Sequence, residues 1–294
     1  MSEGPAVSGG RAVSEGPAVG EGPAVSGTEI GAFRPPDLRG AAVVVTGGGQ
    51  GIGRAIAHGL AAAGARVVID GRHADTLEQV VKEIVAGGGD ADWLEGSVTD
   101  PDHMEALMAK AAGPAGVLHA VVSNAGIAGP TTPLAELSLD DWNETVAVNL
   151  TGVFLTCRAA IPYLRAAPHG KIVLIGSATG KRPLPNRAGY AAAKLGVVGL
   201  ARTLAHELGP DNICVNVISP FMVENARLRR VVATMAEASG LTPEELHHRF
   251  TADTALGRGV TEDDVTRAVL LLCSSAADNL TGQDLNVSSG LVMY

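Results

Sequence analysis

The stretch AAVVVTGGGQGIGRAIAHGLAAA, residues 41–63, decides the fold. It opens on an apolar, β-branched run at Ala41–Val45, which predicts a buried strand, and it continues as a helical pattern at Ile52–Ala63. A glycine-rich turn, Thr46–Gly53, joins the two. A strand that leads through such a turn directly into a helix is the first unit of a parallel sheet covered by helices.

The same order of strand and then helix recurs along the chain. Further strands are predicted at Arg66–Ile69, Ala91–Leu94, Val117–Val122, Lys171–Ile175, Asn212–Ile218 and Gln283–Val287. Further helices are predicted at Asp75–Ala86, Pro101–Ala111, Leu139–Arg165, Ala188–Leu208 and Glu262–Ser274. The fold class is therefore α/β, and we expect a single-domain, Rossmann-like, doubly wound parallel sheet with helices on both faces.

The first 36 residues differ from this pattern. The pentapeptide Glu-Gly-Pro-Ala-Val occurs three times, at Glu3–Val7, Glu15–Val19 and Glu21–Val25. Frequent Gly and Pro disfavour helix and sheet, and the segment has little apolar bulk for a core. We predict a disordered Gly/Pro-rich tail over residues 1–36 and one catalytic domain over residues 37–294.

Composition excludes several classes of function. The formal net charge is -9 and aromatic residues make up 3% of the chain, which argues against nucleic acid as a partner. We found no apolar run approaching about 20 residues, so a membrane-spanning helix is not expected. No secretory signal pattern opens the chain, and the three cysteines are isolated, without metal-ligand spacing. We expect buried thiols, no metal site and a cytoplasmic location.

The turn after the first predicted strand has the character of a phosphate site. Gly47 permits a tight turn, Gly51 lets the backbone approach a pyrophosphate, and Gly53 allows the helix to pack closely on the strand. The helix that follows presents free N–H groups and a positive dipole to an anion. The spacing is G-x3-G-x-G rather than the commoner G-x-G-x-x-G, so on its own the turn indicates only phosphate binding.

A second pattern lies after the predicted strand Lys171–Ile175. Ser177 follows that strand, and Tyr190 and Lys194 come later at positions i and i+4 of a predicted helix, which places them on one face. One ammonium about 4 Å from a phenol, at an effective dielectric of about 20, favours the phenolate by about 4 kcal/mol. This would bring the pKa of Tyr190 toward neutrality from its usual value of about 10. The alternative is a tyrosine packed in the core and a solvated lysine.

With these motifs in order, the chain from Asp37 to Tyr294 resembles the short-chain dehydrogenase/reductase family. The matching segments are Thr46–Gly53, Asn124-Ala125-Gly126, Asn149, Ser177, Tyr190 with Lys194, and Asn216–Pro220. The resemblance implies that Tyr190 is the general acid and base, that Ser177 hydrogen-bonds the substrate oxygen, and that Lys194 holds the nicotinamide ribose and lowers the pKa of Tyr190. It also implies that Asn149 kinks a long helix and anchors a water of the proton relay.

The resemblance further implies a set of cofactor contacts. These are Thr46, Gly47, Gln50, Gly51, Ile52, Gly53, Asp70, Arg72, Ser97, Val98, Asn124, Ala125, Gly126, Tyr190, Lys194, Pro220 and Val223. The choice of dinucleotide depends on Asp70-Gly71-Arg72, because a carboxylate favours a ribose hydroxyl and an arginine favours a 2′-phosphate. Gly71 occupies the position that usually selects the dinucleotide, and Asp70 lies on the alternate side of the strand. Because Arg72 follows directly, NADP(H) is favoured, and NAD(H) remains an alternative.

The chain departs from the family pattern at four places. These are Ser97, Ser123, Phe221, and Ser288-Ser289-Gly290. Phe221 stands where glycine is usual, and it either narrows the substrate pocket or packs outward. A substrate lid is expected over residues 222–257, with one helix at Pro243–Phe250. The lid's arginines, Arg227, Arg229 and Arg230, either attract an acidic or carrier-bound substrate or form a solvated helix face.

The predicted function is an NAD(P)(H)-dependent oxidoreductase that interconverts a ketone and a secondary alcohol. Its partner is a small-molecule or carrier-bound carbonyl compound, so a 3-oxoacyl reductase and a small alcohol or polyol dehydrogenase both stay open. Two alternatives use the same scaffold, namely a lyase, epimerase or cyclase, and a non-catalytic cofactor-binding module. The long helices at Leu139–Arg165 and Ala188–Leu208 carry small residues, and the resemblance implies a homotetramer formed through them.

Overall fold

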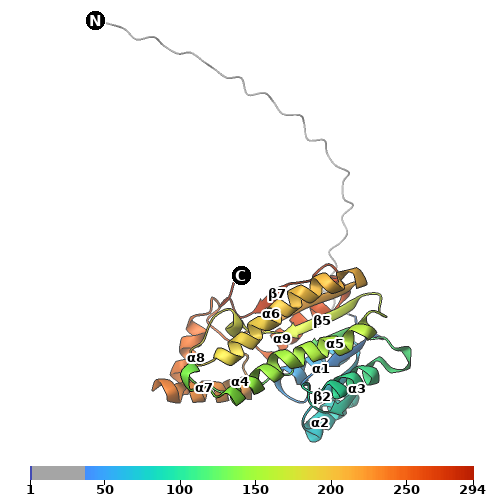
Figure 1. Cartoon of the computed structure of the whole chain (residues 1–294), viewed down its shortest axis with the longest axis horizontal. Coiled ribbons are helices and arrows are strands. Elements are labelled where there is room, and N and C mark those ends of the chain that lie inside the picture. Colours follow the sequence, from blue (N-terminus) through green and yellow to red (C-terminus); the bar gives the residue numbers. More distant parts are fainter. Residues whose placement is uncertain (2–36) are drawn as a thin grey trace. The chain divides into compact units, whose positions relative to one another are not determined.

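The computed structural model describes Met1 and residues 37–294, apart from the side chain of Ala238. The predicted tail, residues 1–36, lies outside the described residues except for Met1. Seven parallel strands form one sheet in the order β3-β2-β1-β4-β5-β6-β7 (Figure 1). The strands are β1 Ala42–Val45, β2 Arg66–Gly71, β3 Asp90–Glu95, β4 Ala120–Ser123, β5 Gly170–Ile175, β6 Ile213–Pro220 and β7 Asp284–Val287.

Helices cover both faces of this sheet, which confirms the predicted fold class. The helices are α1 Gly51–Ala62, α2 Ala74–Ala86, α3 Pro101–Ala112, α4 Leu139–Val146, α5 Gly152–Leu164, α6 Ala188–Leu208, α7 Ala226–Ser239, α8 Pro243–Ala252 and α9 Glu262–Cys273. One core lies between the sheet and α3, α5 and α6, and a second lies between the sheet and α1, α2 and α9. Successive strand residues alternate between these cores, for example Val43 and Val44 of β1, as the two-residue period of a strand requires.

The strand order reverses beside β1. From β1 the chain first builds outward through β2 and β3, and it then crosses to β4 on the other side of β1. In such sheets the ligand site lies beyond the carboxyl ends of the strands at the point of reversal. The loops after β1, β4, β5 and β6 therefore surround the site.

The long helix predicted at Leu139–Arg165 is interrupted. A π-helical turn at Ala147–Thr151 separates α4 from α5. By length and mean hydropathy (1.3) the stretch Leu139–Leu164 is a candidate membrane span, a property that the search for an apolar run did not reveal. Half of its apolar window is buried inside the protein, as in a helix that packs on a sheet.

The predicted lid segment, residues 222–257, contains two helices, α7 and α8. The sequence pattern predicts only α8. The missed helix α7 begins at Asn225, whose side chain accepts a hydrogen bond from the Leu228 amide and caps the helix. Its apolar residues Leu228, Val231, Val232 and Met235 follow at helical spacing. That spacing was a usable signal, but three arginines at the start of the segment obscured it.

Candidate active site

The glycine-rich turn between β1 and α1 is packed too closely for larger residues. A Cβ atom on Gly53 would lie 2.2 Å from the Gly47 carbonyl oxygen. Gly47 and Gly51 have φ values of 67° and 55°, in the left-handed region that glycine adopts without strain. Gly47 and Gly53 thus fill the structural roles that their spacing predicts, a tight turn and close packing of the helix on the strand. The pyrophosphate contact predicted for Gly51 stays a prediction.

The first turn of α1 is suited to an anion. Gln50 precedes the helix with no side-chain capping hydrogen bond, and no acidic residue lies in the first turn. The amide groups at this helix end are therefore not used by a capping side chain. This arrangement fits the pyrophosphate of a dinucleotide, with Gln50, Gly51 and Ile52 at the helix start.

Two loops are joined behind this turn. The Thr46 hydroxyl accepts hydrogen bonds from the amides of Asn124 (3.0 Å) and Ala125 (3.1 Å). The Asn124 side chain donates to the carbonyl oxygens of Thr46 (2.9 Å) and Gly47 (3.2 Å). The contacts fix the loop after β4 against the loop after β1, and they hold Gly126 beside the pocket described below.

Substitution of Gly53 tests this packing. We expect Gly53→Ala to lower the melting temperature and to abolish dinucleotide binding, because the added methyl collides with the Gly47 backbone and opens the turn. Thermal unfolding and dinucleotide titration measure the two effects. Gly209→Ala is the matched control, since nothing lies within 4 Å of its Cβ position. Normal dinucleotide binding by Gly53→Ala would contradict the assignment of the turn.

Asp70 at the end of β2 is engaged within the protein. Its side chain is 1% exposed, accepts a hydrogen bond from the Gly47 amide at 2.8 Å, and lies 3.1 Å from Nε2 of His103. It therefore supports the glycine turn from behind, and Arg72, two residues later, is exposed. The role of His103 has no signal in the sequence, because α3 and β2 meet only in the folded chain.

The loop after β3 meets the long helix near its π-helical turn. The hydroxyl groups of Ser97 and Thr99 lie 2.8 Å apart. Val98 is buried, and its side chain leaves no room for a Cβ atom on Gly152. The loop is thus held against the start of α5.

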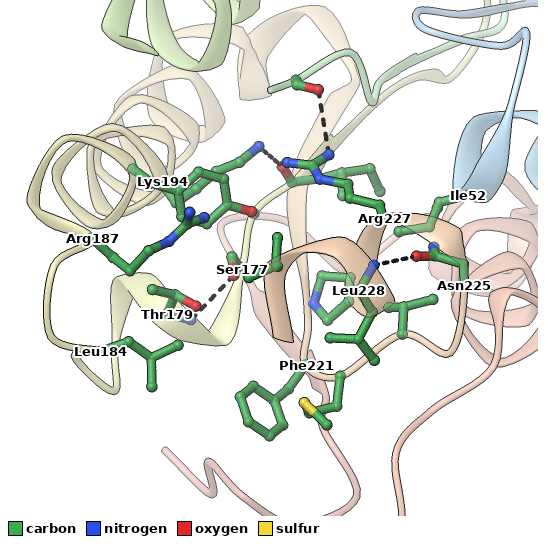
Figure 2. Close-up of a pocket in the computed structure, with 18 of the residues that line it drawn as sticks. Ile52, Ser177, Thr179, Leu184, Arg187, Lys194, Phe221, Asn225, Arg227 and Leu228 are labelled. Atoms are coloured by element: carbon green, nitrogen blue, oxygen red, sulfur yellow. Dashed lines mark hydrogen bonds between the residues drawn. The ribbon is translucent and has the colours of Figure 1, made fainter. Parts of the chain in front are cut away.

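Tyr190, Lys194 and Ser177 line one pocket (Figure 2). The Lys194 ammonium lies 6.0 Å from the centre of the Tyr190 ring and donates a hydrogen bond to the Ile175 carbonyl oxygen at 2.7 Å. The Ser177 hydroxyl accepts a hydrogen bond from the Thr179 amide at 3.1 Å. Lys194 is only 4% exposed, so the alternative of a solvated lysine is wrong.

Asn149 lies at the π-helical turn, where the resemblance implies a kink. Its side-chain amide donates to the carbonyl oxygens of Thr145 (2.9 Å) and Ile127 (3.1 Å), and its side-chain oxygen accepts from the Ile127 amide (3.2 Å). The side chain is fully buried. Asn149 therefore fastens the loop after β4 to the long helix, beside Gly126.

The charges around the phenol alter its acidity. Burial alone would raise the pKa of Tyr190, but the positive charges of Lys194 and Arg227 outweigh it, with smaller contributions from Ser177 and Arg187. The pKa of Tyr190 is therefore below its ordinary value. Burial lowers the pKa of Lys194, an effect that the charge on Tyr190 opposes.

Two arginines complete the site. Arg187 places its guanidinium 4.7 Å from the centre of the Tyr190 ring and is 6% exposed; no sequence pattern singles it out. Arg227 donates to the Gly126 carbonyl oxygen at 3.3 Å and lines the pocket, whereas Arg229 and Arg230 are exposed. Arg229 and Arg230 thus belong to a solvated helix face, whereas Arg227 faces the pocket.

Apolar side chains form the remainder of the pocket, which is partly open to solvent. Phe221 faces it and meets Phe250 edge to face, with ring centres 6.4 Å apart, so Phe221 takes the pocket-lining orientation. Further lining residues are Ile52, Leu184, Pro220, Met222, Val223, Leu228, Val231, Val232 and Met235.

The two adjacent histidines of α8 and the three cysteines do not line this pocket. Nε2 of His247 is 2.9 Å from Glu224, and His248 is exposed. Across residues 37–294 no group of three potential metal ligands occurs. All three cysteines are free and buried, as predicted, and burial raises the pKa of Cys157 and Cys273 to about 12.

Comparison with known proteins matches this arrangement to a family. The family model described as enoyl-(acyl carrier protein) reductase matches residues 47–292. The chain belongs to the short-chain dehydrogenase/reductase family. As a member of that family it is an enzyme, an oxidoreductase that acts on CH–OH and C=O groups and interconverts ketones and secondary alcohols.

Three members of the short-chain dehydrogenase/reductase family illustrate the likeness. The chain is 36% identical to cis-4-hydroxycyclohexanecarboxylate dehydrogenase of Sinomonas cyclohexanicum, over 84% of this chain and 94% of the relative. It is 33% identical to 3-oxoacyl-[acyl-carrier-protein] reductase of Synechocystis sp., over 87% and 99%. A crystal structure of an actinorhodin polyketide ketoreductase variant with NADPH has a TM-score of 0.82 at 34% identity, covering 86% of this chain and 98% of that one.

Proposed function

We propose that this enzyme reduces a ketone with NADPH, and oxidises the corresponding secondary alcohol with NADP, using Tyr190 as its proton donor and acceptor. The supporting observation is the grouping of Tyr190, Lys194 and Ser177 in one pocket with an otherwise largely apolar lining. The site is walled by β5, α6 and the segment after β6. When a substrate fills this pocket, apolar side chains replace water around its carbonyl group and strengthen the interactions with nearby charges.

The proton is handled by the side chains of this chain. In reduction, Tyr190 donates its phenolic proton to the carbonyl oxygen of the substrate as the C–H bond forms. Ser177 donates a hydrogen bond to that same oxygen and stabilises its developing negative charge. Lys194 stabilises the resulting phenolate electrostatically, consistent with the lowered pKa of Tyr190. In oxidation the phenolate takes the proton back.

The residues of the glycine turn fit the dinucleotide that this reaction needs. The start of α1 would hold the pyrophosphate, and Asn124–Gly126 with Lys194 would hold the nicotinamide ribose. Further contacts are proposed at Ser97, Val98, Pro220 and Val223. When bound, the nicotinamide supplies the hydride in reduction and accepts it in oxidation.

The preference for NADP(H) rests on Arg72. Asp70 is buried against Gly47 and His103, so its carboxylate is not free to bind a ribose hydroxyl. Arg72 is exposed beyond the end of β2 and would pair with a 2′-phosphate.

We expect Arg72→Ala to raise the KM for NADPH about 10- to 100-fold, because a charged pair with the phosphate is lost. The KM for NADH should not change. Steady-state kinetics with both dinucleotides measure this, with Arg39→Ala, an exposed arginine before β1 at the opposite end of the sheet, as the control. An unchanged KM for NADPH would mean that the preference is misassigned.

Two substrate classes are consistent with the site. One relative is named for a small ring hydroxy acid, which suggests a small ketone as the substrate. Another is named for a carrier-bound oxoacyl group, which suggests a carrier-bound ketone. The segment 222–257, which contains α7 and α8, would close over the substrate as a lid. A panel of ketones and alcohols, followed by the absorbance of the reduced nicotinamide, separates these classes. Turnover without any change in that absorbance would favour a lyase or epimerase and overturn the proposal.

We propose that the enzyme is a homotetramer and that it is located in the cytoplasm. Apolar side chains are exposed on the long helices at Leu139, Phe154 and Leu195, where a copy of the chain would cover them. The free, buried cysteines suit a reducing compartment. Light scattering should give about four times the chain mass, and Phe154→Glu should lower it. A monomer at micromolar concentration would refute the tetramer.

A further inference from the structure

Among residues 37–294, the two arginines beside Tyr190 have no acidic partner. Figure 2 shows Arg187 and Arg227 on either side of Ser177. Arg187 makes only long hydrogen bonds to the carbonyl oxygen of Gly129 (3.4 Å) and the hydroxyl of Thr131 (3.5 Å). Arg227 bonds to the carbonyl oxygen of Gly126. All these acceptors are uncharged.

The pocket as a whole carries excess positive charge. Lys194 is a third cation there, and no aspartate or glutamate is among the lining residues in the described part of the chain. None of the ion pairs found over residues 37–294 includes Lys194, Arg187 or Arg227. Lys194 and Arg187 are buried and Arg227 is half-buried. Charges withdrawn from water are costly unless they are paired, so three cations in one pocket favour an anionic ligand.

The phenolate of Tyr190 can balance only one of these charges. Lys194 is the cation that shares its helix face, which leaves the guanidinium groups of Arg187 and Arg227. Guanidinium groups match the geometry of a carboxylate. Apolar side chains such as Phe221, Leu228 and Phe250 line the rest of the pocket and suit a hydrocarbon body.

We propose that Arg187 and Arg227 form a carboxylate subsite, and that the substrate of this enzyme is a keto acid or hydroxy acid with an apolar skeleton. This inference rests on the proposed function and names the substrate class of the same site. The same arginines could instead meet a phosphate of the dinucleotide, and the experiment separates these two sources of negative charge.

The test compares a keto acid with its neutral counterpart, 4-oxocyclohexanecarboxylate and its methyl ester, each reduced with NADPH. We expect the acid to have a kcat/KM at least about 10-fold above the ester. Arg187→Met and Arg227→Met should each lower kcat/KM for the acid about 10- to 100-fold more than for the ester, because only the acid loses a charged pair. Both substrates also respond to the loss of a charge that lowers the pKa of Tyr190, so the acid-to-ester ratio is the measure of the subsite. Arg187→Lys and Arg227→Lys should keep part of the preference. Arg229→Met, on an exposed position of α7, is the control and should change neither.

Two measurements keep the subsite separate from the proposed redox activity. Calorimetry with cyclohexanecarboxylate, which cannot be reduced, should show binding to the wild type and weaker binding to both methionine variants. Melting temperatures should stay close to that of the wild type, because the lost guanidinium groups make only long hydrogen bonds to uncharged acceptors and methionine keeps the apolar length of the side chain.

The outcomes are distinct. Equal kcat/KM for acid and ester in the wild type, or an equal loss for both in the variants, would overturn the carboxylate subsite while leaving the redox function intact. A raised KM for NADPH with unchanged KM for the acid would assign the arginines to the dinucleotide. Failure of every ketone and alcohol tested would contradict the proposed function, and binding of cyclohexanecarboxylate would still decide the subsite.

Discussion

Replacing Tyr190 with phenylalanine is expected to lower kcat by about 1,000-fold, since proton transfer by a positioned side chain contributes about 100- to 10,000-fold to the rate. Tyr190 is half-buried beside Lys194, Arg187 and Arg227, and these charges lower the pKa of its phenol. Phenylalanine keeps the ring and its contact with Arg187 but removes the proton. The dissociation constant for NADPH should therefore remain close to that of the wild type.

Steady-state rates and a fluorescence titration of NADPH measure the two quantities. Tyr163→Phe is the matched control, because Tyr163 lies on α5 and does not line the pocket. Turnover by Tyr190→Phe within a few-fold of the wild type would remove Tyr190 from the proton transfer.

Replacing Lys194 with methionine is expected to change both binding and acidity. Methionine is similar in length but uncharged, so the variant loses the proposed contact to the ribose and the charge that most strongly lowers the pKa of Tyr190. We expect kcat/KM for alcohol oxidation to fall about 100- to 1,000-fold. The variant also lacks the hydrogen bond from the buried Lys194 ammonium to the Ile175 carbonyl oxygen, and a melting curve would measure the resulting loss of stability.

The pH dependence provides the sharper test. Oxidation needs the phenolate, so the rate rises with pH through the pKa of Tyr190. In the wild type that pKa lies below the ordinary value of about 10, and in Lys194→Met the midpoint should move to higher pH. Lys194→Arg, which keeps the charge, should retain a low midpoint. The same midpoint in Lys194→Met and in the wild type would show that Lys194 does not tune the phenol.

Most of the sheet was predictable because its strands are buried on both faces. Continuous β-branched runs such as Val43–Val45 occur where a strand contacts helices on each side, and turn glycines mark where it ends. The helix α7 was missed because its apolar spacing begins among charged residues. The resemblance alone implied a kink at Asn149, and the structure shows it to be a π-helical turn, which no propensity distinguishes from the α-helix around it.

The sequence by itself determined the strand-and-helix order, the glycine turn and the shared face of Tyr190 and Lys194, since each is a matter of spacing along a few turns of chain. Only the tertiary structure decided that Asp70 is held by Gly47 and His103, that Phe221 faces the pocket, and that Arg187 and Arg227 converge on one phenol. The physical reason is that burial and charge pairing depend on which segments the sheet brings together, and these residues lie on elements far apart in the chain.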